Sequence, residues 1–235
     1  VLFRSNMAAL TVVFDLDGTL VDTAPDLIET LNMVFAREGL PPTDYALARN
    51  MIGGGARRMI ESGLKAAGRE CSSDKLNRMF EDFIAHYASH IADRSRPFPG
   101  LDDALDRLAA NDCILTVCTN KLERLSRLLL DSLKLTNRFA AICGQDTFGI
   151  QKPNPEILRR TIQAGGGQIQ RAIMVGDSGT DIATARAASV PVVAVDFGYS
   201  ETPIAQLGPD RLIGHFDELA AAIRSEEHTS ELQSH

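Results

Sequence analysis

The feature that most limits the fold of this chain is an alternation of short apolar runs with stretches of helical periodicity. Runs of strand length occupy residues 10–14, 114–118, 140–143, 172–175 and 190–195. Apolar runs that alternate with amphipathic helices are typical of parallel strands whose two faces are both covered by helices. The sequence therefore predicts an α/β fold built on a doubly wound parallel sheet.

The segment between the first two runs, about a hundred residues, is much longer than a single crossover helix requires. From 23 to 93 its periodicity is helical, with Leu27, Leu31, Val34 and Phe35 on one expected face. We therefore expect a small α-helical domain at 23–93, inserted into a core domain formed by 7–22 and 94–223.

The composition narrows the classes of partner. Lys and Arg number 24 against 31 Asp and Glu, a formal net charge of −7, so no broad positive field is available for a nucleic acid. The apolar stretches are far shorter than the roughly 20 residues that cross a bilayer, and no signal peptide is apparent. The four cysteines include no CxxC pair, which favours reduced, structural thiols. We expect a cytoplasmic protein with no nucleic-acid or membrane partner.

Both ends differ from the pattern beside them. Residues 224–235 resemble a translated short-read sequencing adapter, and 1–5 resemble the same kind of sequence read from the other side. We expect both to be non-native and to lie outside the fold. A natural polar tail is the alternative.

Acidic residues follow the first expected strand. Asp15 and Asp17 are two positions apart, and two carboxylates so placed repel each other unless a cation or a proton lies between them. A hard divalent metal with oxygen ligands is the expected solution, and Mg²⁺ is the default when phosphate is present. Gly18 permits a backbone turn that brings main-chain groups against a ligand.

Polar residues also follow the later strands. Thr119 and Asn120 come after the second run, Lys152 precedes an expected helix, and Asp177 and Asp181 follow the fourth run. Taken singly, Thr119, Asn120 and Asp177 are good helix caps, and Lys152 is an ordinary loop lysine. Because the carboxyl ends of parallel strands meet at one edge of the sheet, these side chains are expected to converge there, with Asp177 completing an oxygen cage for the metal.

Taken together in this order, the motifs resemble the haloacid dehalogenase superfamily, whose signature is DxD, a Ser or Thr after a strand, a Lys, and a GDxxxD pair. The segments FDLDGTLVDTAPDL, TNK at 119–121, KPNP at 152–155 and VGDSGTDIATARAA, with the later DFGY and HFDEL, are similar to the bacterial phosphoglycolate phosphatases within it. The likeness covers 10–223 and implies a Rossmann-like core with a helical cap at 23–93. Ser189 departs from the glycine expected there.

The resemblance implies a role for each acid. Asp15 is the nucleophile that forms an aspartyl-phosphate, and Asp17 is the general acid that then becomes the base. Asp15, Asp177 and the main-chain carbonyl of Asp17 hold Mg²⁺, while Asp181 orients Lys152 or metal-bound water.

The resemblance also implies how phosphate is held. Thr119, Asn120 and Lys152, with the turn at Gly18, surround the transferring phosphoryl oxygens. In the cap, Gly54 and Arg57 are candidates for a substrate carboxylate, and a solvated Arg57 is the alternative. His86 and His90 lie one helical turn apart and are expected to be a solvated pair rather than metal ligands.

The expected activity is Mg²⁺-dependent hydrolysis of a small phosphorylated metabolite, first of all 2-phosphoglycolate. The alternatives are other capped phosphatases that act on pyrophosphate, a sugar phosphate or a nucleoside monophosphate, and a phosphomutase. A phospho-receiver and a non-catalytic binding module represent different classes. The protein is expected to be a monomer or a homodimer.

Overall fold

The computed structural model describes residues 8–233, with side chains described to residue 226. Its centre is a parallel sheet of six strands in the order β5-β4-β1-β6-β7-β8. The strands are β1 (Thr11–Phe14), β4 (Ile114–Cys118), β5 (Ala141–Cys143), β6 (Ala172–Gly176), β7 (Val192–Val195) and β8 (Arg211–Ile213). The five expected strands and the α/β class are confirmed.

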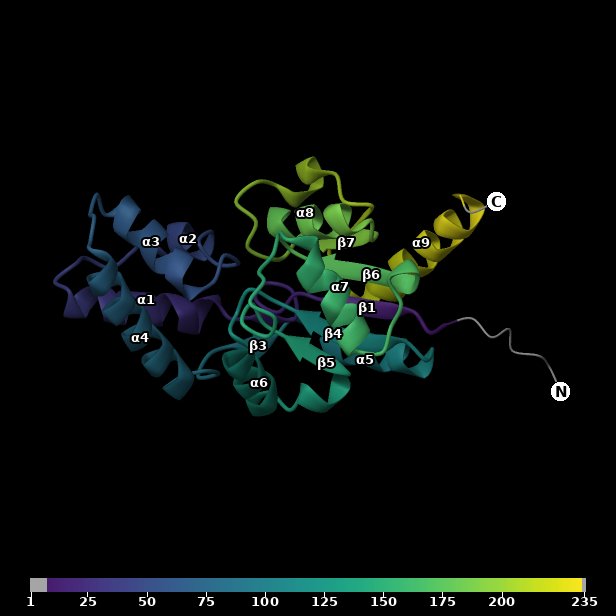
Figure 1. Cartoon of the computed structure of the whole chain (residues 1–235), viewed down its shortest axis with the longest axis horizontal. Coiled ribbons are helices and arrows are strands. Elements are labelled where there is room, and N and C mark those ends of the chain that lie inside the picture. The colour runs from purple at the N-terminus through teal and green to yellow at the C-terminus, as the bar shows by residue number, and fades with distance from the viewer. Residues whose placement is uncertain (1–7, 234–235) are drawn as a thin grey trace.

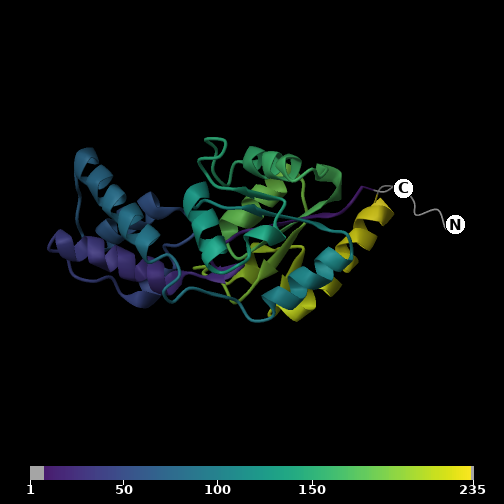
Figure 2. The same ribbon diagram turned by 90° about the horizontal axis from the view of Figure 1, so that it is seen from below.

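Helices cover both faces of the sheet (Figures 1 and 2). One face carries α7 (Pro155–Ala164) and α8 (Gly179–Ala188); the other carries α5 (Leu101–Ala110), α6 (Glu123–Ser132) and α9 (Leu219–Gln233). The two faces are filled by alternate strand residues: Val13 and Met174 point to α7 and α8, whereas Val12 and Val175 point to the opposite side. With helices on both faces of the parallel sheet, the sheet is doubly wound, and the Rossmann-like prediction is confirmed.

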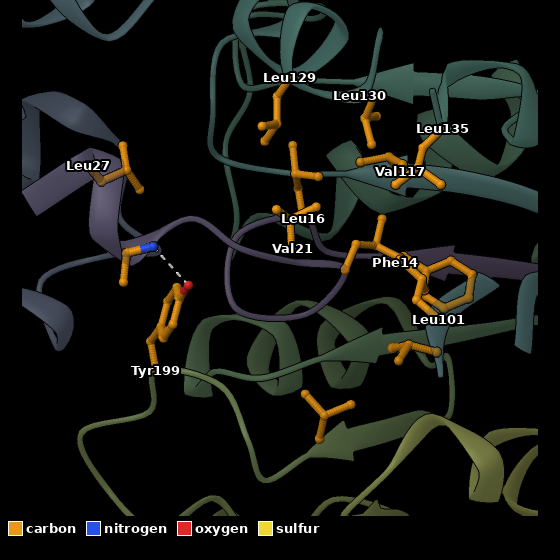
Figure 3. Packing of buried hydrophobic residues seen from close by; sticks show 14 of the residues in the cluster. Phe14, Leu16, Val21, Leu27, Leu101, Val117, Leu129, Leu130, Leu135 and Tyr199 are labelled. Carbon is orange, nitrogen blue, oxygen red and sulfur yellow. Dashed lines mark hydrogen bonds between the residues drawn. The ribbon is translucent and has the colours of Figure 1, made fainter. Parts of the chain in front are cut away.

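The long insert consists mainly of α-helices and lies at one end of the molecule (Figure 1). Its helices are α1 (Ala24–Arg37), α2 (Tyr45–Arg49), α3 (Ala56–Ala66) and α4 (Ser73–Ser89). The face predicted from Leu27, Leu31, Val34 and Phe35 is buried. These residues belong to the same apolar cluster as one face of the sheet, and in Figure 3 Leu16 and Val21 lie between Leu27 and Phe14. The apolar cluster therefore continues from one face of the sheet into the helical insert.

Two features of the fold were absent from the predictions. The segments through which the chain enters and leaves the insert pair with each other as a short antiparallel ribbon, formed by β2 (Val21–Asp22) and β3 (Arg96–Pro97). The edge strand β8 was also missed, because three residues that include an exposed Leu212 carry no readable apolar run. Ser189 ends α8 in the left-handed region with φ 60°, the conformation for which glycine is usual.

The C-terminal segment differs from expectation. Helix α9 continues to Gln233, and the buried Glu226 pairs with Arg211 at 2.9 Å between Oε1 and Nη2. No Gly or Pro interrupts Leu219–Gln233, so helix propensity extends the helix beyond residue 223. The foreign origin of both ends stays a prediction, and 1–5 and 234–235 lie outside the described residues. Within 8–233, no helix is both long and apolar enough to cross a bilayer.

Candidate functional site

Three buried carboxylates converge at the carboxyl end of the sheet. Asp15 directly follows β1, Asp177 directly follows the neighbouring β6, and Asp181 lies in the first turn of α8. One oxygen of each lies within 4.8 Å of the others, and all three side chains are at most 3% exposed. The adjacency of β1 and β6 brings together residues that are far apart in the sequence, as the sheet topology predicts.

Lys152 is the cation in contact with this cluster. Its Nζ lies 2.8 Å from Asp15 Oδ1 and 2.6 Å from Asp181 Oδ1. Burial alone would lower the pKa of Lys152, but Asp15 and Asp181 raise it above its usual value, so the ammonium stays charged. Asp181 thus contacts Lys152, and the role of Asp181 in orienting this lysine or metal-bound water stays a prediction.

One lysine does not balance three buried acids. Burial, together with the charges of Asp181 and Asp17, raises the pKa of Asp15 to about 7. Burial and the charges of Asp181 and Asp15 also raise the pKa of Asp177 well above its usual range. The ammonium of Lys152 is the charged partner of Asp15 Oδ1 and of Asp181 Oδ1, so it is shared between two of the three acids. A divalent cation with oxygen ligands fits this donor set, because it would offset the remaining negative charge.

Asp177 is held in place from several sides. Thr19 Oγ1 donates to its Oδ1 at 2.9 Å, and the main-chain N–H of Tyr199 donates to its Oδ2 at 2.7 Å. Gly18 and Gly198 approach so closely that a Cβ on either would lie 2.4 Å or less from an Asp177 side-chain atom. Gly18 also has φ 86°, which strains other residues. The DxDG glycine therefore makes room for the second acidic motif; a role in binding phosphate stays a prediction.

Asp17 faces away from the three-acid cluster. Its Oδ1 accepts from Thr23 Oγ1 at 2.7 Å and lies 2.9 Å from Lys121 Nζ. Its carboxylate is not part of the oxygen set formed by Asp15, Asp177 and Asp181. The binding of a metal by the main-chain carbonyl of Asp17 stays a prediction, as does the role of its carboxyl group in proton transfer.

The pair after β4 does not cap a helix. The N-cap of α6 is Leu122, and Thr119 Oγ1 instead accepts from the N–H of Lys121 at 3.1 Å. The side-chain oxygen of Asn120 accepts a hydrogen bond from the main-chain N–H of Lys152 at 2.8 Å. Its side-chain nitrogen donates to the main-chain carbonyls of Gly53 and Lys152, both at 3.2 Å. Asn120 thus ties the sheet, the Lys152 loop and the helical insert together, whereas the hydroxyl hydrogen of Thr119 stays available to a ligand. The other expected cap is also different, because Ser178, not Asp177, caps α8.

The sequence model of the haloacid dehalogenase-like hydrolases matches residues 12–195. The chain belongs to this family. The match contains Asp15, Asp17, Thr119, Lys152 and Asp177, so the converging residues and the family assignment rest on the same segments.

Relatives of known name cover nearly the whole chain. A phosphoglycolate phosphatase of Mesorhizobium japonicum is 46% identical over 92% of this chain and 96% of its own, and that of Agrobacterium fabrum is 44% identical over 90% and 91%. A crystal structure described as a predicted phosphoglycolate phosphatase from Haemophilus somnus superposes with a TM-score of 0.84 at 29% identity, covering 92% of this chain and 99% of the other.

This haloacid dehalogenase-like hydrolase also has a small cavity between the insert and the sheet domain, of about 30 Å³. Asp17, Asn120 and Lys121 line it from the sheet side, and Gly55 and Tyr87 are among the residues that line it from the insert. Lys121 is 7% exposed, and its Nζ contacts the hydroxyl of Tyr87 at 3.1 Å as well as Asp17. No role was predicted for Lys121, although it is the third residue of the TNK motif.

Gly54 and Arg57, the two candidates for binding a substrate carboxylate, do not line this cavity. Arg57 is exposed, donates to Asn77 Oδ1 at 2.7 Å and lies over the ring of Phe80 at 5.0 Å. Its neighbours Gly53, Gly55 and Ala56 line the cavity, whereas Gly54 and Arg57 do not. Arg57 thus contacts Asn77 and Phe80 of α4 and does not line the cavity, and its role as a carboxylate ligand stays a prediction.

His86, in the last turn of α4, and His90, its C-cap, stack with ring centroids 4.2 Å apart. The expectation that this pair is solvated rather than a metal site stays a prediction.

Proposed function

We propose that this hydrolase is a Mg²⁺-dependent phosphatase whose substrate is 2-phosphoglycolate. The observation that carries the proposal is the buried cluster of Asp15, Asp177 and Asp181 with Lys152 beside the nucleophile, and Asp17 turned toward the cavity. The names of the relatives at 46% and 44% identity support the choice of substrate.

In the first step, the carboxylate of Asp15 attacks phosphorus and the bond between phosphorus and the ester oxygen breaks. Asp17 gives its proton to the departing oxygen, so glycolate leaves as a neutral alcohol at that position. Asp15 and phosphorus then form an aspartyl-phosphate, and one difficult displacement becomes two easier ones. Thr23 holds Asp17 in the orientation from which it serves this role.

In the second step, Asp17 takes a proton from water, and the water oxygen attacks phosphorus. The bond from phosphorus to Asp15 breaks and phosphate leaves. Lys152 neutralises charge on the transferring oxygens, and the Thr119 hydroxyl donates to them. Asp15, Asp177 and the carbonyl of Asp17 would hold Mg²⁺, whose charge would reduce the repulsion between the anionic nucleophile and the anionic substrate.

The helical insert, 23–93, serves as the cap domain of this core in our proposal, and 7–22 with 94–223 form the catalytic domain. The cavity between the insert and the sheet domain is small, about 30 Å³, which supports a small leaving group rather than a sugar or a nucleoside. Four cysteines without a CxxC pair, with Cys118 and Cys143 buried as thiols, support action in a reducing compartment such as the cytoplasm.

Phosphate release from a panel of substrates tests the proposal. The panel contains 2-phosphoglycolate, pyrophosphate, glucose 1-phosphate and a nucleoside monophosphate, each with Mg²⁺ and with EDTA. We expect the highest kcat/KM for 2-phosphoglycolate and no turnover in EDTA. A preference for pyrophosphate would overturn the substrate while leaving the phosphatase mechanism intact.

The nucleophile is tested by Asp15→Asn, which removes the attacking oxygen charge at nearly constant volume. We expect turnover to fall by at least about 10³-fold, since the chemical step loses its nucleophile. Asp102→Asn, on the exposed side of α5, is the matched control and should retain activity. An active Asp15→Asn enzyme would mean that another group attacks phosphorus.

A further inference from the structure

Lys121 is a buried cation without a place in the mechanism above. It belongs to the loop between β4 and α6, is 7% exposed, and lines the cavity between the cap and the core. Burying an ammonium group is costly unless its hydrogen bonds are met, so its position needs an explanation.

The protein meets only part of the hydrogen-bonding capacity of Lys121. Its Nζ lies 2.9 Å from Asp17 Oδ1 and 3.1 Å from the Tyr87 hydroxyl. An ammonium group has three donors, and among the contacts described these two are its polar partners. Burial raises the pKa of Tyr87, so its hydroxyl stays protonated and is itself able to donate. One donor of Lys121 and the Tyr87 hydroxyl proton are thus left for a ligand in the cavity.

The first turn of α3 lines the cavity from the opposite side. Gly55, the N-cap, and Ala56, the first helical residue, are both lining residues. The N-cap has no side chain with which to accept from the turn, and the turn contains no acidic residue. The free N–H groups and the positive end of this 11-residue helix therefore add to the field of Lys121.

The rest of the lining strengthens this field. Asp17 and Lys121 are the charged side chains of the cavity, and most of the other lining residues are apolar, contributed by α1, α3, α4 and α6. An anion in such a site meets little competing water, so each ionic contact is stronger than it would be on the surface.

We propose that Lys121, with the Tyr87 hydroxyl and the first turn of α3, binds the carboxylate of the substrate and sets the preference for 2-phosphoglycolate. The inference rests on the function proposed above. In that substrate one carbon separates the ester oxygen from the carboxyl group. The residue that protonates the ester oxygen, Asp17, is in direct contact with Lys121, so a leaving group of this length places its carboxylate at Lys121.

The test compares 2-phosphoglycolate with 2-hydroxyethyl phosphate, which has a neutral hydroxymethyl group in place of the carboxylate. The measured quantity is the ratio of the two kcat/KM values. For Lys121→Met we expect the ratio to fall about 10- to 100-fold, the size of a lost charge-assisted contact. Lys121→Arg should retain most of the preference, since it keeps the cation. Lys75→Met is the control, because this partly exposed lysine of α4 pairs with Glu38 and does not line the cavity; it should leave the ratio unchanged.

Several outcomes would overturn the proposal. If Lys121→Met lowers kcat/KM equally for both substrates, Lys121 serves Asp17 and not the carboxylate. If Arg57→Met, and not Lys121→Met, removes the preference, the carboxylate lies on the other side of α3. A wild-type enzyme that cleaves both substrates equally well would refute the carboxylate subsite and leave the phosphatase standing; this measurement needs no variant to fold. Absence of Mg²⁺-dependent turnover on any phosphomonoester would instead refute the proposed function.

Discussion

The hydroxyl of Tyr199 provides a sharp test of how the cap is anchored to the core. It accepts from the N–H groups of Thr23 and Ala24, at 2.7 and 3.0 Å, and donates to Asp22 Oδ1 at 2.6 Å. Figure 3 shows the Tyr199 hydroxyl pointing toward the start of the helix that carries Leu27, with one of these hydrogen bonds drawn as a dashed line. Thr23, the N-cap of α1, makes no side-chain cap bond, so Tyr199 takes over the capping of this helix.

Tyr199→Phe removes one oxygen and retains the packing of a ring that is 4% exposed. It leaves two buried N–H groups without their acceptor and Asp22 without a charge-assisted donor. At about 1 kcal/mol for each contact, and somewhat more for the one to the carboxylate, we expect the free energy of unfolding to fall by about 2–4 kcal/mol. For a chain of this size, the corresponding fall in Tm is about 5–15 °C.

Urea denaturation followed by circular dichroism measures this loss. Tyr45→Phe is the matched control, because Tyr45 is 50% exposed and should change stability by less than about 0.5 kcal/mol. The N–H of residue 199 still reaches Asp177 in Tyr199→Phe, so dependence on Mg²⁺ should persist. Equal stability of the two variants would refute the argument that Tyr199 caps α1.

Three further predictions follow from the acidic cluster and its supports. Because burial raises the pKa of Asp15 to about 7, the folded metal-free protein keeps a proton on Asp15 that the unfolded chain releases. Urea titrations in EDTA should therefore show the free energy of unfolding falling from about pH 4 to pH 7. At pH 8, added Mg²⁺ should restore the lost stability. A flat profile in EDTA would contradict the raised pKa. Gly18→Ala forces a Cβ against Asp177 and should lower kcat at least about 10-fold. The control is Gly39→Ala, which has the same left-handed backbone but open space around it and should lower stability only. Equal kinetics of the two variants would contradict the close approach of Gly18 to Asp177. Asn120→Ala releases Gly53 and Lys152 from one another and should raise KM, which steady-state kinetics would detect; an unchanged KM would mean that the tie is not needed for binding.

The sequence predicted the core of the site because its signals are local. Asp15, Asp177 and Thr119 each follow an apolar run, and the rule that parallel strands end at one edge was sufficient to bring them together. The order β4-β1-β6 then fulfilled that rule, with β1 lying between the two other strands. Lys152 was found through its fixed place before α7, and its contact with both Asp15 and Asp181 agrees with the role suggested for Asp181.

The residues around the leaving group were predicted less well. Arg57 and Gly54 follow from a pattern of glycines before a helix, but the pattern does not fix which residue of the turn faces inward; Gly55 and Ala56 do. Lys121 and Tyr87 meet only because α4 packs over the end of β4, and they are 34 positions apart. No periodicity in either segment signals that contact.

By itself, the sequence determined the layered sheet, the helical insert and the identity of the acids at the strand ends, because strand length, helical period and the charge of a buried turn are properties of neighbouring residues. Only the tertiary structure decided that Asp17 faces Lys121 and the cavity, while Asp15 and Asp177 face one another. The physical reason is that side-chain direction and burial depend on packing between distant segments. The same packing determines the pKa of a buried carboxyl group and the partners that a lysine ammonium group contacts.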